Sequence, residues 1–126
     1  LSLGKKPQDI VIASDSAGGG LTLATLLHIR DKGLEQPRCA VTFSPGSNAF
    51  PDDKILDALD PSDAMLSADI IRTVIDIYIP NPDDRSHPYA SPCLGSYTVI
   101  CPLPISSSTD DVPYADGKRA RPAAAH

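Results

Sequence analysis

Residues 14–18 read Ser-Asp-Ser-Ala-Gly and lie between a short apolar run, Ile10 to Ala13, and a longer apolar stretch typical of a helix. A serine on such a tight strand-to-helix turn projects its hydroxyl away from the chain, and the residues two before and two after it must be small. Ser14 and Gly18 meet this condition around Ser16. The pattern therefore predicts that Ser16 is a nucleophile.

The residue after Ser16 has a predicted task as well. Ala17 lies at the N-terminus of the expected helix, so its amide can donate a hydrogen bond to an oxyanion that develops during attack by the serine. The helix dipole adds positive potential at the same point. The usual pattern is Gly-x-Ser-x-Gly, whereas this chain has Ser14 at the first position, a slightly larger residue that is still small.

The chain does not match the sequence motifs of phosphate-binding, dinucleotide-binding or calcium-binding loops. Gly18 to Gly20 lacks the Gly-Lys-Ser/Thr ending of a phosphate-binding loop, and the third glycine of a dinucleotide fingerprint would fall on Leu23. The aspartates between positions 52 and 63 lack the glycine and the terminal glutamate of a calcium loop. These aspartates indicate a solvated loop, and no metal or organic cofactor is predicted.

Two strands and a helix must position Ser16. The β-branched run Ile10 to Ala13 is typical of a strand covered on both faces, as in a parallel sheet. A largely buried helix is expected from Leu21 to Lys32, where Gly33 provides the stop. The second strand is expected at Cys39 to Phe43.

The second half of the chain has weaker signals. Residues 46–66 read as a long loop with at most a helical turn near Ile55 to Leu59. Ser67 is a predicted N-cap for a helix that continues to Tyr78. A last strand is expected from Leu103 to Ser107, although Pro102 and Pro104 cannot donate hydrogen bonds to a sheet.

The order strand, helix, strand, helix, strand indicates an α/β fold with a parallel sheet and flanking helices. Three strands make a thin sheet with open edges, which a complete domain avoids. The chain also begins at Leu1 and contains a single methionine, Met65. We therefore expect a single partial domain over residues 1–126, with self-association through an exposed sheet edge.

Composition excludes several classes of protein. The 126 residues are enough for one domain, and 11 basic against 16 acidic side chains give a net charge of −5, which disfavours a nucleic-acid surface. No apolar run approaches the ~20 residues needed to span a bilayer. Cys39, Cys93 and Cys101 are odd in number and lack CxxC spacing, so they indicate free thiols in a reducing compartment and a cytoplasmic location.

The motif from Asp15 to Gly19 resembles the nucleophile motif of the hormone-sensitive-lipase-like branch of the α/β-hydrolases, and the resemblance covers residues 7–119 in the family's order. Four further segments support it: Arg30 to Gly33, Ser44-Pro45, His87 to Pro92, and Leu103 to Ile105 followed by Ser108 to Asp111.

The resemblance implies a partial α/β-hydrolase fold with a nucleophile turn near residues 10–20 and an acid loop near residues 105–116. It implies a carboxylesterase or lipase-like enzyme in which Ser16 attacks a small-molecule ester and forms an acyl-enzyme. Asp111 is the implied acid of the triad, with Asp110 as the second choice. The family's upstream oxyanion loop and strands and its downstream histidine segment are expected to be missing.

No histidine of this chain qualifies as the general base. His28 lies twelve residues from Ser16 along the expected helix, roughly 18 Å at 1.5 Å per residue. His87 is expected to be a surface residue or to pin a loop, and His126 could reach the site only through a tail. The alternative interpretation is therefore a catalytically inactive truncated fragment or pseudo-enzyme.

Overall fold

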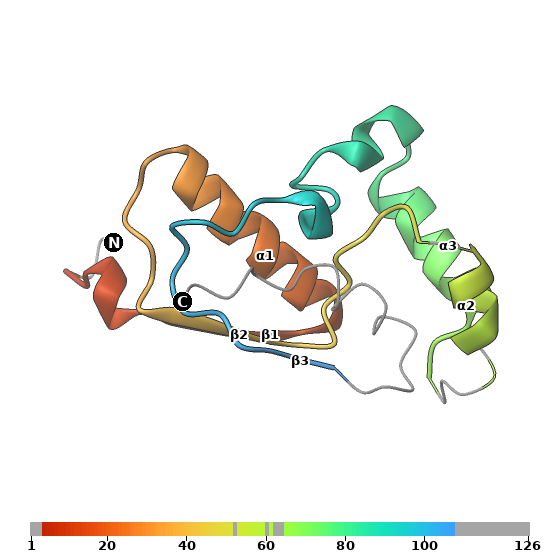
Figure 1. Cartoon of the computed structure of the whole chain (residues 1–126), viewed down its shortest axis with the longest axis horizontal. Helices are drawn as coiled ribbons and strands as arrows, with labels where there is room; N and C mark the ends of the chain where they lie inside the picture. The colour runs from red at the N-terminus through yellow and green to blue at the C-terminus, as the bar shows by residue number, and fades with distance from the viewer. Residues whose placement is uncertain (1–3, 52, 60, 62–64, 108–126) are drawn as a thin grey trace.

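The computed structural model describes residues 4–51, 53–59, 61 and 65–107 (Figure 1). Three parallel strands form a sheet in the order β1-β2-β3, which confirms the predicted α/β fold. The strands are β1 (Val11–Asp15), β2 (Cys39–Phe43) and β3 (Ile105–Ser106). The helices are α1 (Ser16–Asp31), α2 (Asp53–Leu59) and α3 (Ala68–Tyr78), with 3-10 turns at Pro7–Asp9, Pro82–Ser86 and Pro92–Leu94.

The strand β1 is less covered than predicted. Its residues alternate between exposed and half-buried, and Val11 is 55% exposed. Within the described residues, β1 pairs only with β2, and α1 covers one face of the sheet (Figure 1). The prediction of a strand covered on both faces is therefore wrong for this part of the chain, because no described element packs on the second face.

Prolines shorten β3. The predicted strand from Leu103 to Ser107 is reduced to Ile105–Ser106, since Pro102 and Pro104 have no amide to donate. Their carbonyls still accept hydrogen bonds from β2, at 3.0 Å from the Ala40 amide to Pro102 and 3.1 Å from the Thr42 amide to Pro104. The pairing between β2 and β3 therefore extends beyond the regular strand.

The helix α1 begins at Ser16, five residues before the predicted start, because the glycine run that was expected to be a turn is helical. Leu23, Leu26 and Leu27 are fully buried where α1 packs on the sheet. The helix ends at Asp31, and Gly33 follows with a φ of +63°, as the predicted stop requires.

The helices α2 and α3 lie together beyond one end of α1 (Figure 1). Ser67 is the N-cap of α3, as predicted, and its hydroxyl accepts a hydrogen bond from the Ile70 amide at 3.2 Å. The region expected to hold at most a helical turn contains the seven-residue helix α2. Among the described residues, no helix is long and apolar enough to cross a membrane.

Candidate active site

Ser16 occupies the sharp turn where β1 ends and α1 begins. Its φ is +49°, a left-handed conformation that is uncommon for a residue with a side chain. Such a conformation costs on the order of 1–3 kcal/mol and persists only when the surroundings enforce it. The predicted strand-to-helix turn at Ser16 is confirmed, and the residue is exposed.

The loop that follows β2 holds this turn from one side. The Gly46 amide donates a hydrogen bond to the Ser16 carbonyl at 3.0 Å. A Cβ on Gly19 would lie 2.7 Å from Cβ of Pro45, and a Cβ on Gly20 would collide with the Gly46 carbonyl oxygen. Close packing therefore requires glycine at positions 19 and 20, and no local pattern in the sequence indicates this requirement.

Ser14 fits at the position where the usual pattern has glycine. Its hydroxyl oxygen accepts a hydrogen bond from the Thr22 hydroxyl at 2.9 Å. A Cβ on Gly18 would meet Cβ of Ser14 at 3.6 Å, an ordinary contact. The expected need for a tiny residue at position 18 is thus weaker than the need at positions 19 and 20.

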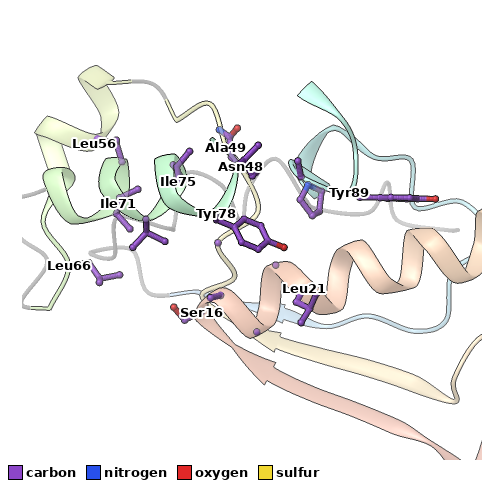
Figure 2. A pocket seen from close by; sticks show the side chains of 18 residues that line it. Ser16, Leu21, Asn48, Ala49, Leu56, Leu66, Ile71, Ile75, Tyr78 and Tyr89 are labelled. Atoms are coloured by element: carbon purple, nitrogen blue, oxygen red, sulfur yellow. The ribbon is translucent and has the colours of Figure 1, made fainter. Parts of the chain in front are cut away.

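A cavity of about 390 Å³ adjoins Ser16 (Figure 2). One side is formed by the first residues of α1, and the facing side is formed by the apolar side chains of α3. Figure 2 shows Ile71, Ile75 and Tyr78 on α3, across the cavity from α1. The larger aliphatic side chains that line the cavity are Leu21, Leu56, Leu66, Ile71, Val74, Ile75 and Ile79, and the two lining tyrosines are Tyr78 and Tyr89.

Ser91 joins three segments around the cavity. Its buried hydroxyl donates to the Arg85 carbonyl at 2.6 Å and accepts from the Ala49 amide at 2.9 Å. Arg85 in turn binds Asp76 of α3 at 2.6 Å and the Ile79 carbonyl at 3.1 Å. The loop after β2, the end of α3 and the segment before Pro92–Leu94 are thus fixed relative to one another.

The first turn of α1 offers amides to the same cavity. Ala17 and Gly18 line it, and the first amides of a helix have no acceptor within the helix. Asp15 precedes the helix, but its side chain makes no capping hydrogen bond. The positive end of a 16-residue helix therefore faces the space beside the Ser16 hydroxyl.

A family model described as alpha/beta hydrolase fold matches residues 2–124. The chain belongs to this family. An acetyl-hydrolase from Streptomyces hygroscopicus is 32% identical over 124 residues, which cover 98% of this chain and 41% of that protein. An esterase from Acinetobacter venetianus is 26% identical over 118 residues, which cover 94% of this chain and 39% of that protein.

Solved structures agree with this assignment. EstE5 soaked with ethyl alcohol matches with a TM-score of 0.87 and 34% identity over 94% of this chain and 40% of EstE5. A hormone-sensitive lipase from a metagenome library matches with a TM-score of 0.86 and 26% identity over 95% of this chain and 41% of that protein. The chain is a hormone-sensitive-lipase-like α/β-hydrolase that spans about 40% of the length of these relatives.

The strand ends of this α/β-hydrolase are aligned at one edge of the sheet. Asp15 of β1 pairs with Phe43 of β2, and Phe43 pairs with Ser106 of β3. The chain therefore leaves β3 at the same edge of the sheet as Ser16. Asp110 and Asp111, the predicted acids, lie outside the described residues.

The two described histidines lie around Tyr89. The His28 ring is 5.4 Å from the Tyr89 ring between centroids, and His87 Nδ1 accepts a hydrogen bond from the Tyr89 amide at 3.1 Å. His87 thus pins a loop, as predicted. Within the described part of the chain, neither histidine is hydrogen-bonded to Ser16, and His126 lies outside that part.

Tyr89 also contacts the C-terminal end of α1. Its hydroxyl donates to Asp31 Oδ2 at 2.9 Å, and Arg30 binds the other carboxylate oxygen. The hydrogen bond from Arg30, followed by that from Tyr89, holds the pKa of the Asp31 carboxyl below its usual range. In the described residues, no group of three or more His, Cys, Asp or Glu side chains is arranged to hold a metal ion.

Proposed function

We propose that Ser16 is the nucleophile of a carboxylic-ester hydrolase. The observation that carries this proposal is the φ of +49° at a serine between β1 and α1, with its hydroxyl beside an apolar cavity. A strained turn of this kind exposes the nucleophile of α/β-hydrolases at the end of a strand. The relatives named acetyl-hydrolase and esterase support the same reaction class.

The proposed reaction has two steps. In the first, Ser16 Oγ attacks the ester carbonyl carbon while a general base takes the serine proton, and the alcohol leaves with a proton as the acyl-enzyme forms. The negative oxygen that develops during attack accepts hydrogen bonds from the first turn of α1, with the Ala17 amide as the principal donor. In the second step, water attacks the acyl-enzyme and releases the carboxylic acid.

The acid of the triad is proposed to be Asp111, with Asp110 as the second choice. Its task is to orient the imidazole of the base and to stabilise the imidazolium. Both aspartates follow β3, which ends at the same edge of the sheet as Ser16. None of the steps requires a metal or an organic cofactor.

The proposed substrate is a small-molecule ester with an apolar portion. The cavity beside Ser16 has a volume of about 390 Å³ and is lined mainly by aliphatic side chains. Such a lining stabilises an apolar acyl or alcohol group by removing it from water. Self-association through the exposed edge of β1 and a cytoplasmic location stay predictions from the sequence.

A catalytically inactive protein is the second candidate. The observation in its favour is that the two described histidines, His28 and His87, contact Tyr89 and are not hydrogen-bonded to Ser16. In this case, Ser16 would retain the geometry of a nucleophile without a base to take its proton.

A fluorophosphonate probe and a short-chain p-nitrophenyl ester test both candidates. The proposed function requires that the probe label the parent chain and a Ser96→Ala control, since Ser96 is an exposed serine that contacts Thr98. Ser16→Ala should abolish labelling and ester turnover. Absence of both labelling and turnover in the parent chain would favour the inactive alternative, because a serine without a base is not activated. Labelling that persists in Ser16→Ala would exclude Ser16 as the nucleophile.

A further inference from the structure

Thr22 forms a different hydrogen bond from two other threonines on the helices. Thr25 in α1 donates to the Leu21 carbonyl at 2.7 Å, and Thr73 in α3 donates to the Asp69 carbonyl at 2.8 Å. Both of these bonds connect a threonine to the residue four positions earlier, which is the usual local choice in a helix. Thr22 instead donates to the Ser14 hydroxyl, outside its own helix, at 2.9 Å.

The bond from Thr22 to Ser14 spans the turn that carries Ser16. Ser14 lies on β1, two residues before Ser16, and Thr22 lies on α1, six residues after it. Thr22 is only 6% exposed, so its hydroxyl has little access to water as an alternative partner. Partial burial strengthens the bond and makes the loss of one partner costly.

We propose that Ser14 and Thr22 are positioning residues that hold Ser16 in its strained conformation. This inference rests on the proposed role of Ser16 as a nucleophile. The usual glycine at position 14 has no side chain, so it cannot supply such a bond. The hydroxyl pair joins the strand and the helix on either side of Ser16, while the Gly46 amide holds the Ser16 carbonyl from the neighbouring loop.

A serine that only fills space would leave Thr22 free to make the local bond. Its hydroxyl would then donate to the Gly18 carbonyl, as Thr25 does to Leu21. In the structure, Thr22 does not bond to the Gly18 carbonyl. It bonds to Ser14 instead, so the hydrogen bond restrains the turn between β1 and α1. The restraint therefore acts on the angle at which β1 passes into α1, and through it on the direction of the Ser16 hydroxyl.

Thr22→Val is the main test, because valine keeps the shape of threonine and removes the hydroxyl. Thr25→Val is the matched control on the same helix, and Thr22→Ser should restore the parent behaviour because it retains a donor. Exchange of the Gly46 amide, measured by NMR, reports on its bond to the Ser16 carbonyl. The Arg38 amide, which donates to the Ile10 carbonyl at the other end of β1, reports on general destabilisation.

In Thr22→Val we expect exchange at Gly46 to rise about three- to tenfold relative to exchange at Arg38, the effect of losing one net hydrogen bond. The maximal rate of fluorophosphonate labelling should fall by a similar factor, with an unchanged half-saturating probe concentration. Ser14→Ala added to Thr22→Val should cause no further loss, because the bond is already absent.

The outcomes separate this inference from the proposed function. If the parent chain is labelled and Thr22→Val matches Thr25→Val in either labelling rate or Gly46 exchange, the positioning role is overturned while the nucleophile stands. Equal increases in exchange at Gly46 and Arg38 would also overturn it, since they indicate a general structural role. If the parent is not labelled but Gly46 responds selectively, the positioning pair is supported and the proposed nucleophile fails.

Discussion

The two sides of the cavity are held by different kinds of interaction. On the serine side, residues 14–20 pack so closely against the loop after β2 that Gly19 and Gly20 leave no space for a side chain, and a backbone hydrogen bond fixes Ser16. On the facing side, α2 and α3 share a small apolar cluster of Leu56, Ala68 and Ile71. Ionic contacts of Arg72 also join these two helices.

This difference indicates that the two sides of the cavity have different roles. Close packing of backbone has few alternative arrangements, so the serine side is suited to keep Ser16, the proposed nucleophile, in one geometry. Exposed ion pairs contribute little each and depend on salt, so the α2–α3 side tolerates changes in side chains. The geometry of Ser16 and the fit of the proposed ester are therefore expected to respond to different substitutions.

The largest expected effect comes from Gly20→Ala. The new Cβ would collide with the Gly46 carbonyl oxygen, so the loop or the helix must move. We expect a loss of about 1–3 kcal/mol in the free energy of unfolding, the usual cost of overpacking. Urea denaturation measures it, and Gly18→Ala is the matched control because its Cβ makes only an ordinary contact. Equal stability of the two variants would contradict the close-packing argument.

The next largest effect is expected from Ser91→Ala. The substitution leaves the Ala49 amide and the Arg85 carbonyl without their buried partner. We expect a loss of about 1–3 kcal/mol in the free energy of unfolding, at the lower end if water replaces the hydroxyl. Ser86→Ala is the control, since Ser86 is exposed and donates one bond of 3.3 Å. A loss no larger than that of the control would show that Ser91 does not hold the cavity together.

A smaller effect is expected from Arg72→Gln. Arg72 binds Asp53 at 3.0 Å, Asp57 at 2.8 Å and Asp69 at 3.2 Å, and all three carboxylates are well exposed. We expect a lower melting temperature at low salt, with the difference from the parent chain shrinking toward ~1 M NaCl, where the screening length is ~3 Å. Arg38→Gln is the control because Arg38 donates to a carbonyl, that of Gln8. If the difference in melting temperature persists at high salt, the aliphatic part of the Arg72 side chain stabilises the protein by packing and not by its charge.

The smallest expected effect concerns the contribution of Asp31 to stability and its dependence on pH. The pKa of Asp31 is lowered in the folded chain, so its contribution to stability is present above the ordinary value of about 4 and is lost as the pH falls through the folded value. Tyr89→Phe removes one of the two hydrogen bonds that lower this pKa, so the Asp31 titration measured by NMR should move upward. Tyr97→Phe is the control, since Tyr97 donates to the Pro92 carbonyl. An unchanged Asp31 titration in Tyr89→Phe would show that the Tyr89 hydrogen bond does not lower the pKa of Asp31.

The sequence predicts the features that depend on residues close together along the chain. The turn at Ser16, the strand Cys39–Phe43 and the N-cap Ser67 each follow from a local pattern, and all three are found in the structure. The predicted start of α1 lies too late in the chain because glycine has a low helix propensity, whereas packing against Pro45 favours glycine in this helix.

The cavity could not be predicted in the same way. The sequence predicts the helix that continues to Tyr78, but not that Ile71, Ile75 and Tyr78 of this helix lie across the cavity from the start of α1. That placement depends on Ser91 and Arg85, whose partners lie elsewhere in the chain. Likewise, the exposure of β1 depends on which elements pack on its second face, and a single strand's residues cannot specify that.

The hydrogen bond between the Gly46 amide and the Ser16 carbonyl joins two main-chain groups. Every residue type except proline supplies the same amide, and a Cβ at position 46 would come no closer than 4.0 Å to the Ser16 carbonyl oxygen. Protein engineers can therefore vary the side chain at position 46, next to the cavity, while the support of the serine is retained. The loop offers a starting point for a library that varies the fit of the proposed ester without redesigning the turn.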